Sequence, residues 1–312
     1  MSSFSLDQLK IFRAIAQQGS FKRAADSLYI SQPAVSLQIQ NLEAAVGIPL
    51  FNRSGRKAEL TEGGRIFLEY CGRILELCDE SYRALTDLED LKGGSLVIGA
   101  SQTTGTYVMP RLIGEFHRRY PEIAVQLRVL STRRAAYGVA EGKLDLSIIG
   151  GEIPNELVGR LRIELYAEDE LALVVPAQHA LANCEVIDKE ILYTMRFIAL
   201  DPESTTRRVL DEVLRRFNID VSRLNIEMEL SSIEAIKAAV QADLGVAFVS
   251  ATAIEKEIHL GVLRRIQVSG LTLRRPLSLL TDPQRYESRA AKVFREQILA
   301  NYANGLLSPQ PN

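Results

Sequence analysis

Apolar residues recur at helical spacing through three short segments near the start of the chain, residues 6–19, 20–29 and 31–46. Gly19 is placed to end the first helix, and Ser20 and Ser31 are placed to cap the second and third. Because only residues 29–30 separate the second helix from the third, the two must cross steeply. The pattern therefore predicts a helix-turn-helix.

The third helix has a regular apolar face and an opposite face that carries few charges. Its core side is predicted to be Val35, Ile39, Leu42 and Val46. Short polar side chains and a lone leucine on the other side fit the major groove of DNA, where they can reach base edges and a thymine methyl group. Packing against another protein surface is the alternative. The predicted base-contacting residues are Gln32, Pro33, Ser36, Leu37 and Gln40.

Cations lie on both sides of this helix in the sequence, although the formal net charge of the chain is −2. Lys22 and Arg23 open the second helix, and Arg53 and Arg56 lie in the turn of PLFNRSGRKAELTEGG. That stretch has two short extended runs around a basic turn, as a β-wing has. We expect these four cations to bind DNA phosphates or the minor groove.

Residues 64–91 contain no proline and repeat apolar positions at alternating steps of three and four, as a coiled coil does. A helix lying on its own domain is the alternative. The coiled coil is preferred because the heptad holds throughout and because a small winged domain needs a twin to bind DNA tightly. The predicted dimer-helix residues are Phe67, Tyr70, Ile74 and Leu77.

The pattern changes to alternating strands and helices after Gly93 and Gly94. This alternation predicts an α/β fold with parallel strands. The predicted domains are a winged helix-turn-helix over 1–63, a linker helix over 64–92 and an effector-binding domain over 93–312. The latter divides into lobe I, about 93–167 and 270–303, and lobe II, about 168–269, with hinges near 165–171 and 266–272.

A two-lobed α/β domain usually binds its ligand where strands end and helices begin, and several such positions here carry hydroxyl groups or cations. These groups suit a small anion, although a single hydroxyl at such a position is more often just a helix cap. The candidate effector-binding residues are Ser101, Gln102, Thr103, Thr104, Thr132, Arg133, Arg134, Ser204, Thr205 and Ser232.

Other functional classes receive little support from the sequence. The three histidines are scattered, and neither a nucleophile elbow nor a phosphate-binding loop is present, so no enzymatic activity is predicted. Three cysteines without metal or disulfide spacing suit a reducing cytoplasm, and we expect no metal and no bound cofactor. No apolar run is long enough to span a membrane, so no membrane partner is expected.

The order GSFKRAADSLYISQPAVSLQIQNLEAAVGIPLFNRSGRKAELTEGG closely resembles the winged helix-turn-helix of LysR-type transcriptional regulators. Many members of that family have arginine where this chain has Leu37. The resemblance continues through the rest of the chain. It implies a periplasmic-binding-protein-like effector domain, a dimer formed through the linker helix, and a tetramer as the working assembly. Double-stranded promoter DNA is the implied partner, and RNA polymerase is a further candidate.

The stretches GASQTTGTYVMPRLIG and EMELSSIEAIKAAVQADLGVAFVS resemble the cyanobacterial and plastid branch that regulates the Rubisco operon and inorganic-carbon acquisition. The resemblance implies 2-oxoglutarate, 2-phosphoglycolate, ribulose bisphosphate or NADP as candidate effectors. The expected function is sequence-specific DNA binding modulated by a small anionic metabolite. The alternative is a solute-sensing module that acts through protein contacts.

Overall fold

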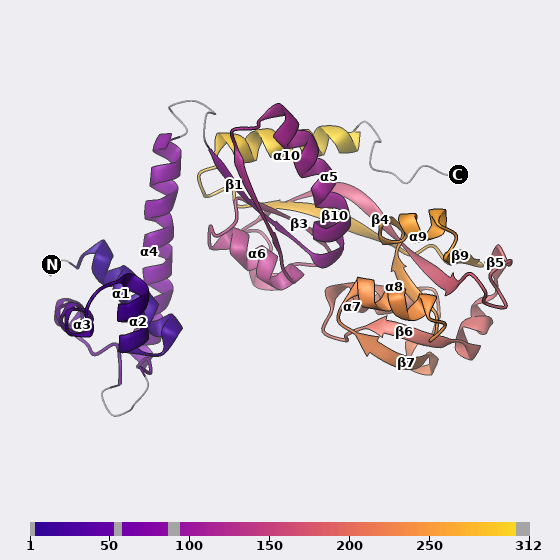
Figure 1. Cartoon of the computed structure of the whole chain (residues 1–312), viewed down its shortest axis with the longest axis horizontal. Coiled ribbons are helices and arrows are strands. Elements are labelled where there is room, and N and C mark those ends of the chain that lie inside the picture. The colour runs from indigo at the N-terminus through magenta and orange to yellow at the C-terminus, as the bar shows by residue number, and fades with distance from the viewer. Residues whose placement is uncertain (1–3, 53–57, 87–93, 304–312) are drawn as a thin grey trace. The chain divides into compact units, whose positions relative to one another are not determined.

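The computed structural model describes residues 4–52, 58–86 and 94–303, and the chain divides into two compact units, Met1–Leu85 and Thr86–Asn312. The first unit is helical with a short extended pair, and the second is an α/β domain of two lobes (Figure 1). This arrangement confirms the predicted fold class. Among the described residues, no helix is both long and apolar enough to cross a membrane.

The first unit consists of four helices around one apolar core. They are α1 (Leu6–Gln18), α2 (Phe21–Leu28), α3 (Gln32–Val46) and α4 (Glu62–Thr86). The hydroxyls of Ser20 and Ser31 accept hydrogen bonds from Arg23 N and Ala34 N, which confirms them as caps of α2 and α3. Gly19 ends α1 at φ 61°, a left-handed conformation that favours glycine.

Helix α4 begins against the extended segment that follows α3. Thr61 caps it, because its hydroxyl accepts from Gly64 N at 2.9 Å and donates to Pro49 O at 2.8 Å. A β-carbon on Gly64 would lie 2.1 Å from the carbonyl oxygen of Leu50. Only glycine therefore allows α4 to start this close to that segment.

The second unit alternates strands and helices as the sequence predicts, with several elements that the prediction did not include. Its helices are α5 (Met109–Arg119), α6 (Thr132–Ala140), α7 (Thr205–Arg216), α8 (Ile233–Gln241), α9 (Glu255–His259) and α10 (Arg289–Ala303). One π-helical turn, η2 (Thr104–Val108), precedes α5, and 3-10 turns are η3 (Asn155–Leu157), η4 (Lys189–Thr194), η5 (Val221–Arg223) and η6 (Ala251–Ala253). Its strands are β1 (Ser95–Ala100), β2 (Ala124–Val129), β3 (Leu146–Gly150), β4 (Arg162–Pro176), β5 (Val186–Ile187), β6 (Arg196–Leu200), β7 (Asn225–Leu230), β8 (Ala247–Ser250), β9 (Leu263–Val268) and β10 (Arg274–Thr281).

Two long antiparallel strands run through the domain and join its lobes. The large sheet has the order β2-β1-β3-β10-β4-β9-β5, with β8 also paired to β4, and β6 and β7 form a second, parallel pair. Strand β4 pairs with β10 up to Glu170 and with β8 from Leu171 onward, so it passes from lobe I into lobe II near these residues. The chain returns to lobe I between Val268 and Arg274, the start of β10.

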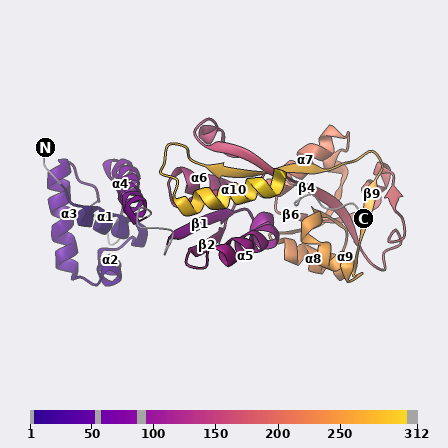
Figure 2. The same cartoon turned by 90° about the horizontal axis from the view of Figure 1, so that it is seen from above.

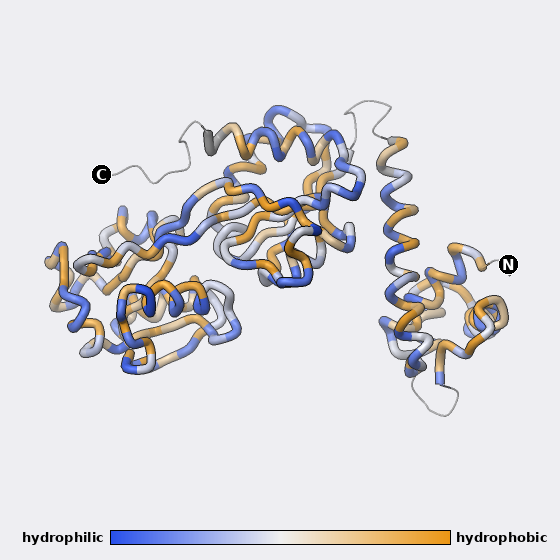
Figure 3. Tube along the Cα trace, turned by 180° about the vertical axis from the view of Figure 1, so that it is seen from behind, coloured by the Kyte–Doolittle hydropathy of each residue, from blue (hydrophilic) through white to orange (hydrophobic). Residues whose placement is uncertain are grey.

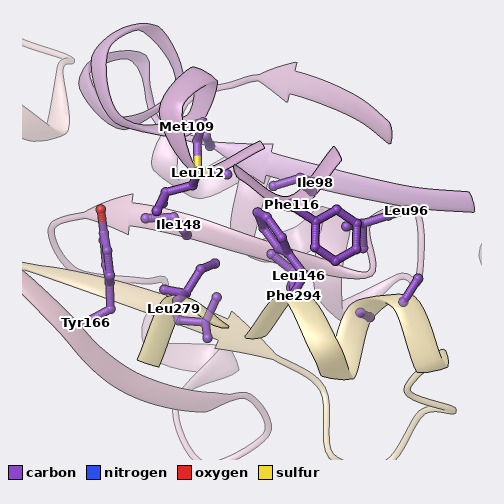
Figure 4. Packing of buried hydrophobic residues seen from close by; sticks show 14 of the residues in the cluster. Leu96, Ile98, Met109, Leu112, Phe116, Leu146, Ile148, Tyr166, Leu279 and Phe294 are labelled. Atoms are coloured by element: carbon purple, nitrogen blue, oxygen red, sulfur yellow. The ribbon is translucent and has the colours of Figure 1, made fainter. Parts of the chain in front are cut away.

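Each lobe has apolar cores on both faces of its strands. In lobe I, α5 and α10 pack on one face, where Phe116 and Phe294 meet edge to face with ring centroids 5.0 Å apart (Figures 2 and 4). Helix α6 covers the other face. In lobe II, α8 contributes to one core and α7 to the other. The lobes are therefore separately packed bodies joined mainly by β4 and β10.

Three strands carry only a weak signal in the sequence. Strands β5, β7 and β9 are short or lie toward the edges of their sheets, and β7 alternates exposed and half-buried residues. The apolar run ALVV (Ala172–Val175) lies in the second half of β4, which begins at Arg162. In the first half of β4, the apolar side chains of Ile163 and Leu165 are exposed. Apolar residues there do not mark a buried face, so the sequence pattern of a half-buried strand is weak.

Candidate DNA-binding surface and effector site

The third helix presents the two faces that the sequence predicts. Val35, Ile39 and Leu42 are buried in the core of the first unit. The predicted base-contacting set Gln32, Pro33, Leu37 and Gln40 is exposed, and Ser36 is half-buried. Leu37 is 55% exposed. The outer face of α3 is thus an uncharged surface with polar and apolar tips.

The helices beside α3 hold it in place and add positive charge. Gln8 of α1 donates to the side-chain oxygen of Gln38 at 3.1 Å, which ties α1 to α3. Lys22 and Arg23, at the start of α2, are exposed. Helix α2 ends at Tyr29, which adopts φ 56° and is 96% exposed at the turn before α3. The cations and α3 therefore belong to one small helical body.

The predicted wing is present as a short antiparallel pair. Phe51 and Leu60 form a β-bridge, and Asn52 N donates to Glu59 O at 2.8 Å. Glu43 of α3 accepts from Leu50 N at 2.7 Å and from Phe51 N at 3.2 Å, so the recognition helix positions the base of the wing. Arg53 and Arg56 lie outside the described residues.

The structure divides the predicted dimer-helix residues into two groups. Phe67 and Ile74 pack against the core of their own unit, where the Phe67 ring lies 5.2 Å from that of Phe12. Tyr70 and Leu77 are exposed by 54% and 63%. Phe67 and Ile74 thus have partners within their own unit, and Tyr70 and Leu77 are the two predicted dimer-helix residues that expose more than half of their surface. Figure 3 shows hydrophobic and hydrophilic residues alternating along α4.

The hydroxyl groups that follow β1 are mostly used inside the protein. Thr104 is fully buried, and its hydroxyl lies 2.9 Å from Ile148 O and 3.0 Å from Ser101 O. Ser101 Oγ lies 3.0 Å from Thr104 Oγ1. The predicted effector contact of Thr104 would have to compete with these internal hydrogen bonds. Gln102 is exposed, whereas Thr103 is buried and its hydroxyl accepts from Arg275.

Thr103 belongs to a buried polar network that crosses the lobe junction. Arg275 of β10 donates to Thr103 Oγ1 at 3.0 Å and to Thr206 Oγ1, on α7 of lobe II, at 2.7 Å. Asp169 of β4 lies 2.7 Å from both Nε and Nη2 of Arg275. The side chains of this ion pair are each 1% exposed. Asp169 also accepts from Ser250 Oγ, at the end of β8, at 2.5 Å.

The candidates on α6 do not gather at this network. Thr132 is buried, while Arg133 lies over the ring of Tyr137 at 5.3 Å and 3.8 Å from Glu156 on the surface of lobe I. Arg134 is exposed and lines a separate depression of about 500 Å³. The side chains of Arg133 and Arg134 therefore extend along lobe I and do not reach the network around Arg275.

The candidates of lobe II occupy the starts of α7 and α8. Ser204 and Ser232 hold the N-cap positions, yet neither side chain makes a capping hydrogen bond. Both are half-buried, and neither hydroxyl bonds to any residue in the described part of the chain. Thr205 lies against lobe I, since a β-carbon on Gly151 would be 2.5 Å from its methyl carbon.

A second polar contact joins the lobes one turn beyond Thr103. Tyr107 of η2 donates to Glu234 of α8 at 2.6 Å, and buried Lys237 lies 5.0 Å from the centre of its ring. Burial and this hydrogen bond raise the pKa of Tyr107, and the same bond lowers the pKa of Glu234. Both shifts favour a neutral phenol that donates to a carboxylate.

Four residues of this network were not predicted from the sequence: Arg275, Asp169, Thr206 and Ser250. They come from four different elements, and Arg275 and Asp169 are 106 residues apart. One signal was available: Arg275 and Asp169 each lie two residues before a leucine, Leu277 and Leu171, and so share the face of the strand that carries apolar residues. A charge on the buried face of a strand requires a partner.

A winged helix-turn-helix with an uncharged recognition face and a two-lobed α/β domain with polar groups at its junction define a DNA-binding protein that responds to small molecules. Residues 6–65 match the model of the bacterial regulatory helix-turn-helix protein, lysR family, and residues 89–303 match that of the LysR substrate binding domain. The chain belongs to the LysR family and is a LysR-type transcriptional regulator, as the sequence resemblance predicted.

Individual relatives agree with this assignment. A protein of Gracilaria tenuistipitata var. liui named "Probable RuBisCO transcriptional regulator" is 58% identical over 296 residues, which cover 95% of this chain and 96% of the relative. Full-length CbnR, solved with its target DNA, has a similar fold with a TM-score of 0.70 at 23% identity, over 95% of this chain and 99% of that one. The CcmR regulatory domain of Synechocystis PCC6803, solved with 2-PG, matches 70% of this chain and 100% of its own with a TM-score of 0.60 at 24% identity.

Proposed function

We propose that this regulator binds a promoter of carbon-fixation genes, the Rubisco operon foremost, and that a small anionic metabolite modulates the binding. The observation that carries the proposal is the 58% identity, over 95% of the chain, to a relative named as a probable RuBisCO transcriptional regulator. The proposal places the protein in the cytoplasm with promoter DNA and RNA polymerase as its partners, and it includes no catalytic step.

The DNA contact is proposed for the exposed face of α3. Gln32 can pair with adenine, Ser36 can bond to either base type, and the Leu37 side chain can meet a thymine methyl group. Lys22 and Arg23, together with Arg53 and Arg56 of the wing, would bind phosphates and carry no sequence information. The proposal is supported by the exposure of this face and by its lack of charge.

Gln32→Ala and Ser36→Ala are each expected to reduce discrimination between promoter and random DNA by roughly 1–3 kcal/mol at one base pair. The loss arises because a base edge would keep its hydrogen-bonding groups without a protein partner. Affinities for both DNAs would be measured by fluorescence anisotropy at a fixed salt concentration. Gln17→Ala, at an exposed position of α1, is the matched control and should leave both affinities unchanged. Equal losses on promoter and random DNA would contradict the base contact.

Self-association is proposed through the exposed apolar residues of α4. Ile66, Tyr70 and Leu77 fall at helical spacing and are 57%, 54% and 63% exposed. Exposure of such an apolar row to water is unfavourable, and a second copy of the helix could bury it. A pair of winged domains would then bind a two-fold symmetric site.

Leu77→Asp is expected to weaken self-association by about 10-fold or more, because a carboxylate would be buried in an apolar contact without a partner. Sedimentation velocity over a range of concentrations would measure the change. The control is Asp79→Arg, which alters charge at an exposed position on another side of α4. An unchanged association constant for Leu77→Asp would move the interface elsewhere.

A further inference from the structure

Arg275 lies where the two connecting strands pass from one lobe to the other. Its fully buried guanidinium reaches a hydroxyl of lobe I, Thr103, a hydroxyl of lobe II, Thr206, and the carboxylate of Asp169. The carboxylate balances the positive charge and fixes the plane of the guanidinium. Because Nη1 and Nη2 share one carbon, the two hydroxyls that they bind lie side by side across the lobe junction.

These hydrogen bonds determine which way the two hydroxyl protons can point. A guanidinium can only donate, so Thr103 and Thr206 must accept from it. Each hydroxyl keeps one proton of its own, and no described residue accepts either proton. A hydroxyl that accepts from a cation is also polarised into a stronger donor. The pair therefore offers two donors and needs an acceptor that the described part of the protein does not supply.

The surrounding backbone makes room for this arrangement. A β-carbon on Gly150 would lie 3.2 Å from Cζ of Arg275, closer than most side-chain neighbours can approach. Gly151 adopts φ 139°, and its missing side chain lets Thr205 approach lobe I. Two consecutive glycines at the end of β3 thus allow both the guanidinium and the start of α7 to approach the same point.

We propose that Arg275 is the positioning residue of the effector site, and that it turns the hydroxyls of Thr103 and Thr206 toward one anionic group of the ligand. A carboxylate or phosphate oxygen accepts both protons and so bridges the lobes. This assignment rests on the proposed function, because it specifies how that effector is bound. Arg275 itself stays paired with Asp169 and acts through the hydroxyls. The unbonded hydroxyls of Ser204 and Ser232 lie at the starts of lobe II helices and can serve other polar groups of the same ligand.

The test compares Thr103→Val and Thr206→Val with the conservative changes Thr103→Ser and Thr206→Ser in the full chain. Isothermal titration would measure binding of 2-phosphoglycolate, 2-oxoglutarate and inorganic phosphate. Each valine variant should bind the anion that the parent binds about 10-fold more weakly or worse, since a charge-assisted hydrogen bond is lost. Each serine variant should retain most of the affinity, because it keeps the hydroxyl. Thr194→Val, whose hydroxyl bonds to Ile191 O within lobe II, is the matched control and should bind like the parent.

The outcomes separate this inference from the proposed function. If the parent binds an anion and both valine variants bind it equally well, the assignment of Thr103 and Thr206 is overturned while an anionic effector stands. If serine variants lose as much affinity as valine variants, packing rather than the hydroxyl matters, and the assignment also fails. If the parent binds none of the three anions, both the assignment and the effector part of the proposed function are overturned. DNA binding by α3 is tested independently by the Gln32 and Ser36 variants.

Discussion

Asp169→Ala is expected to lower the free energy of unfolding of the effector domain by about 3–5 kcal/mol. The carboxylate lies 2.7 Å from Arg275, and both side chains are 1% exposed. Removing it leaves a buried guanidinium without a counter-charge, which is far more costly than losing an ion pair in water. Differential scanning calorimetry of the full chain would measure the change.

The neighbouring residue provides the control for this variant. Glu168 pairs with Arg274 at 3.2 Å, yet the two side chains are 55% and 59% exposed. Glu168→Ala should therefore change stability by no more than about 1 kcal/mol. The double variant Asp169→Leu with Arg275→Met should recover much of the loss, because it removes both charges together. A loss for Asp169→Ala as small as that for Glu168→Ala would show that Arg275 does not depend on this partner.

Phe12→Ala is expected to destabilise the winged helix-turn-helix by about 3–5 kcal/mol and to abolish DNA binding at 37 °C as a consequence. The Phe12 ring is fully buried and lies 5.3 Å from Phe51 of the wing and 5.2 Å from Phe67 of α4. Truncation would open a cavity where three segments meet. DNA binding and the calorimetric transition of the first unit would report the effect.

A control variant and a control measurement test whether the effect of Phe12→Ala is confined to the winged helix-turn-helix. Phe4→Ala alters a 38% exposed ring at the edge of the same cluster and should reduce stability by only about 1 kcal/mol. Anion binding to the effector domain should persist in Phe12→Ala, because the two parts of the chain are separate compact units. Retention of full DNA affinity by Phe12→Ala would contradict the role of this cluster in holding α3.

The helix-turn-helix was predictable because local signals agree there. Serine caps, Gly19 and the recurrence of Val35, Ile39 and Leu42 all act within a few residues of each other. The same local information cannot tell what covers an apolar face. Phe67 and Ile74 belong to the same heptad repeat as Tyr70 and Leu77, yet only Phe67 and Ile74 meet the core of their own domain.

The lobe junction illustrates the limit more sharply. The sequence predicted polar side chains at the ends of strands. Of these, Thr103 reaches the lobe junction. Thr104 instead bonds within lobe I, and Arg133 lies along the surface of lobe I. The spacing of residues predicts which segment holds a side chain. Spacing does not predict the rotamer of that side chain, because the rotamer depends on neighbours from other segments.

The sequence by itself determined the family, the recognition helix and its two faces, and the α/β character of the second unit, because these depend on short-range periodicity and capping. Only the tertiary structure decided that Arg275, Asp169, Thr103 and Thr206 meet. The three partners of Arg275 lie between 69 and 172 residues away from it in the sequence. Strand pairing and lobe packing bring such distant groups together, and no local pattern records where those contacts form.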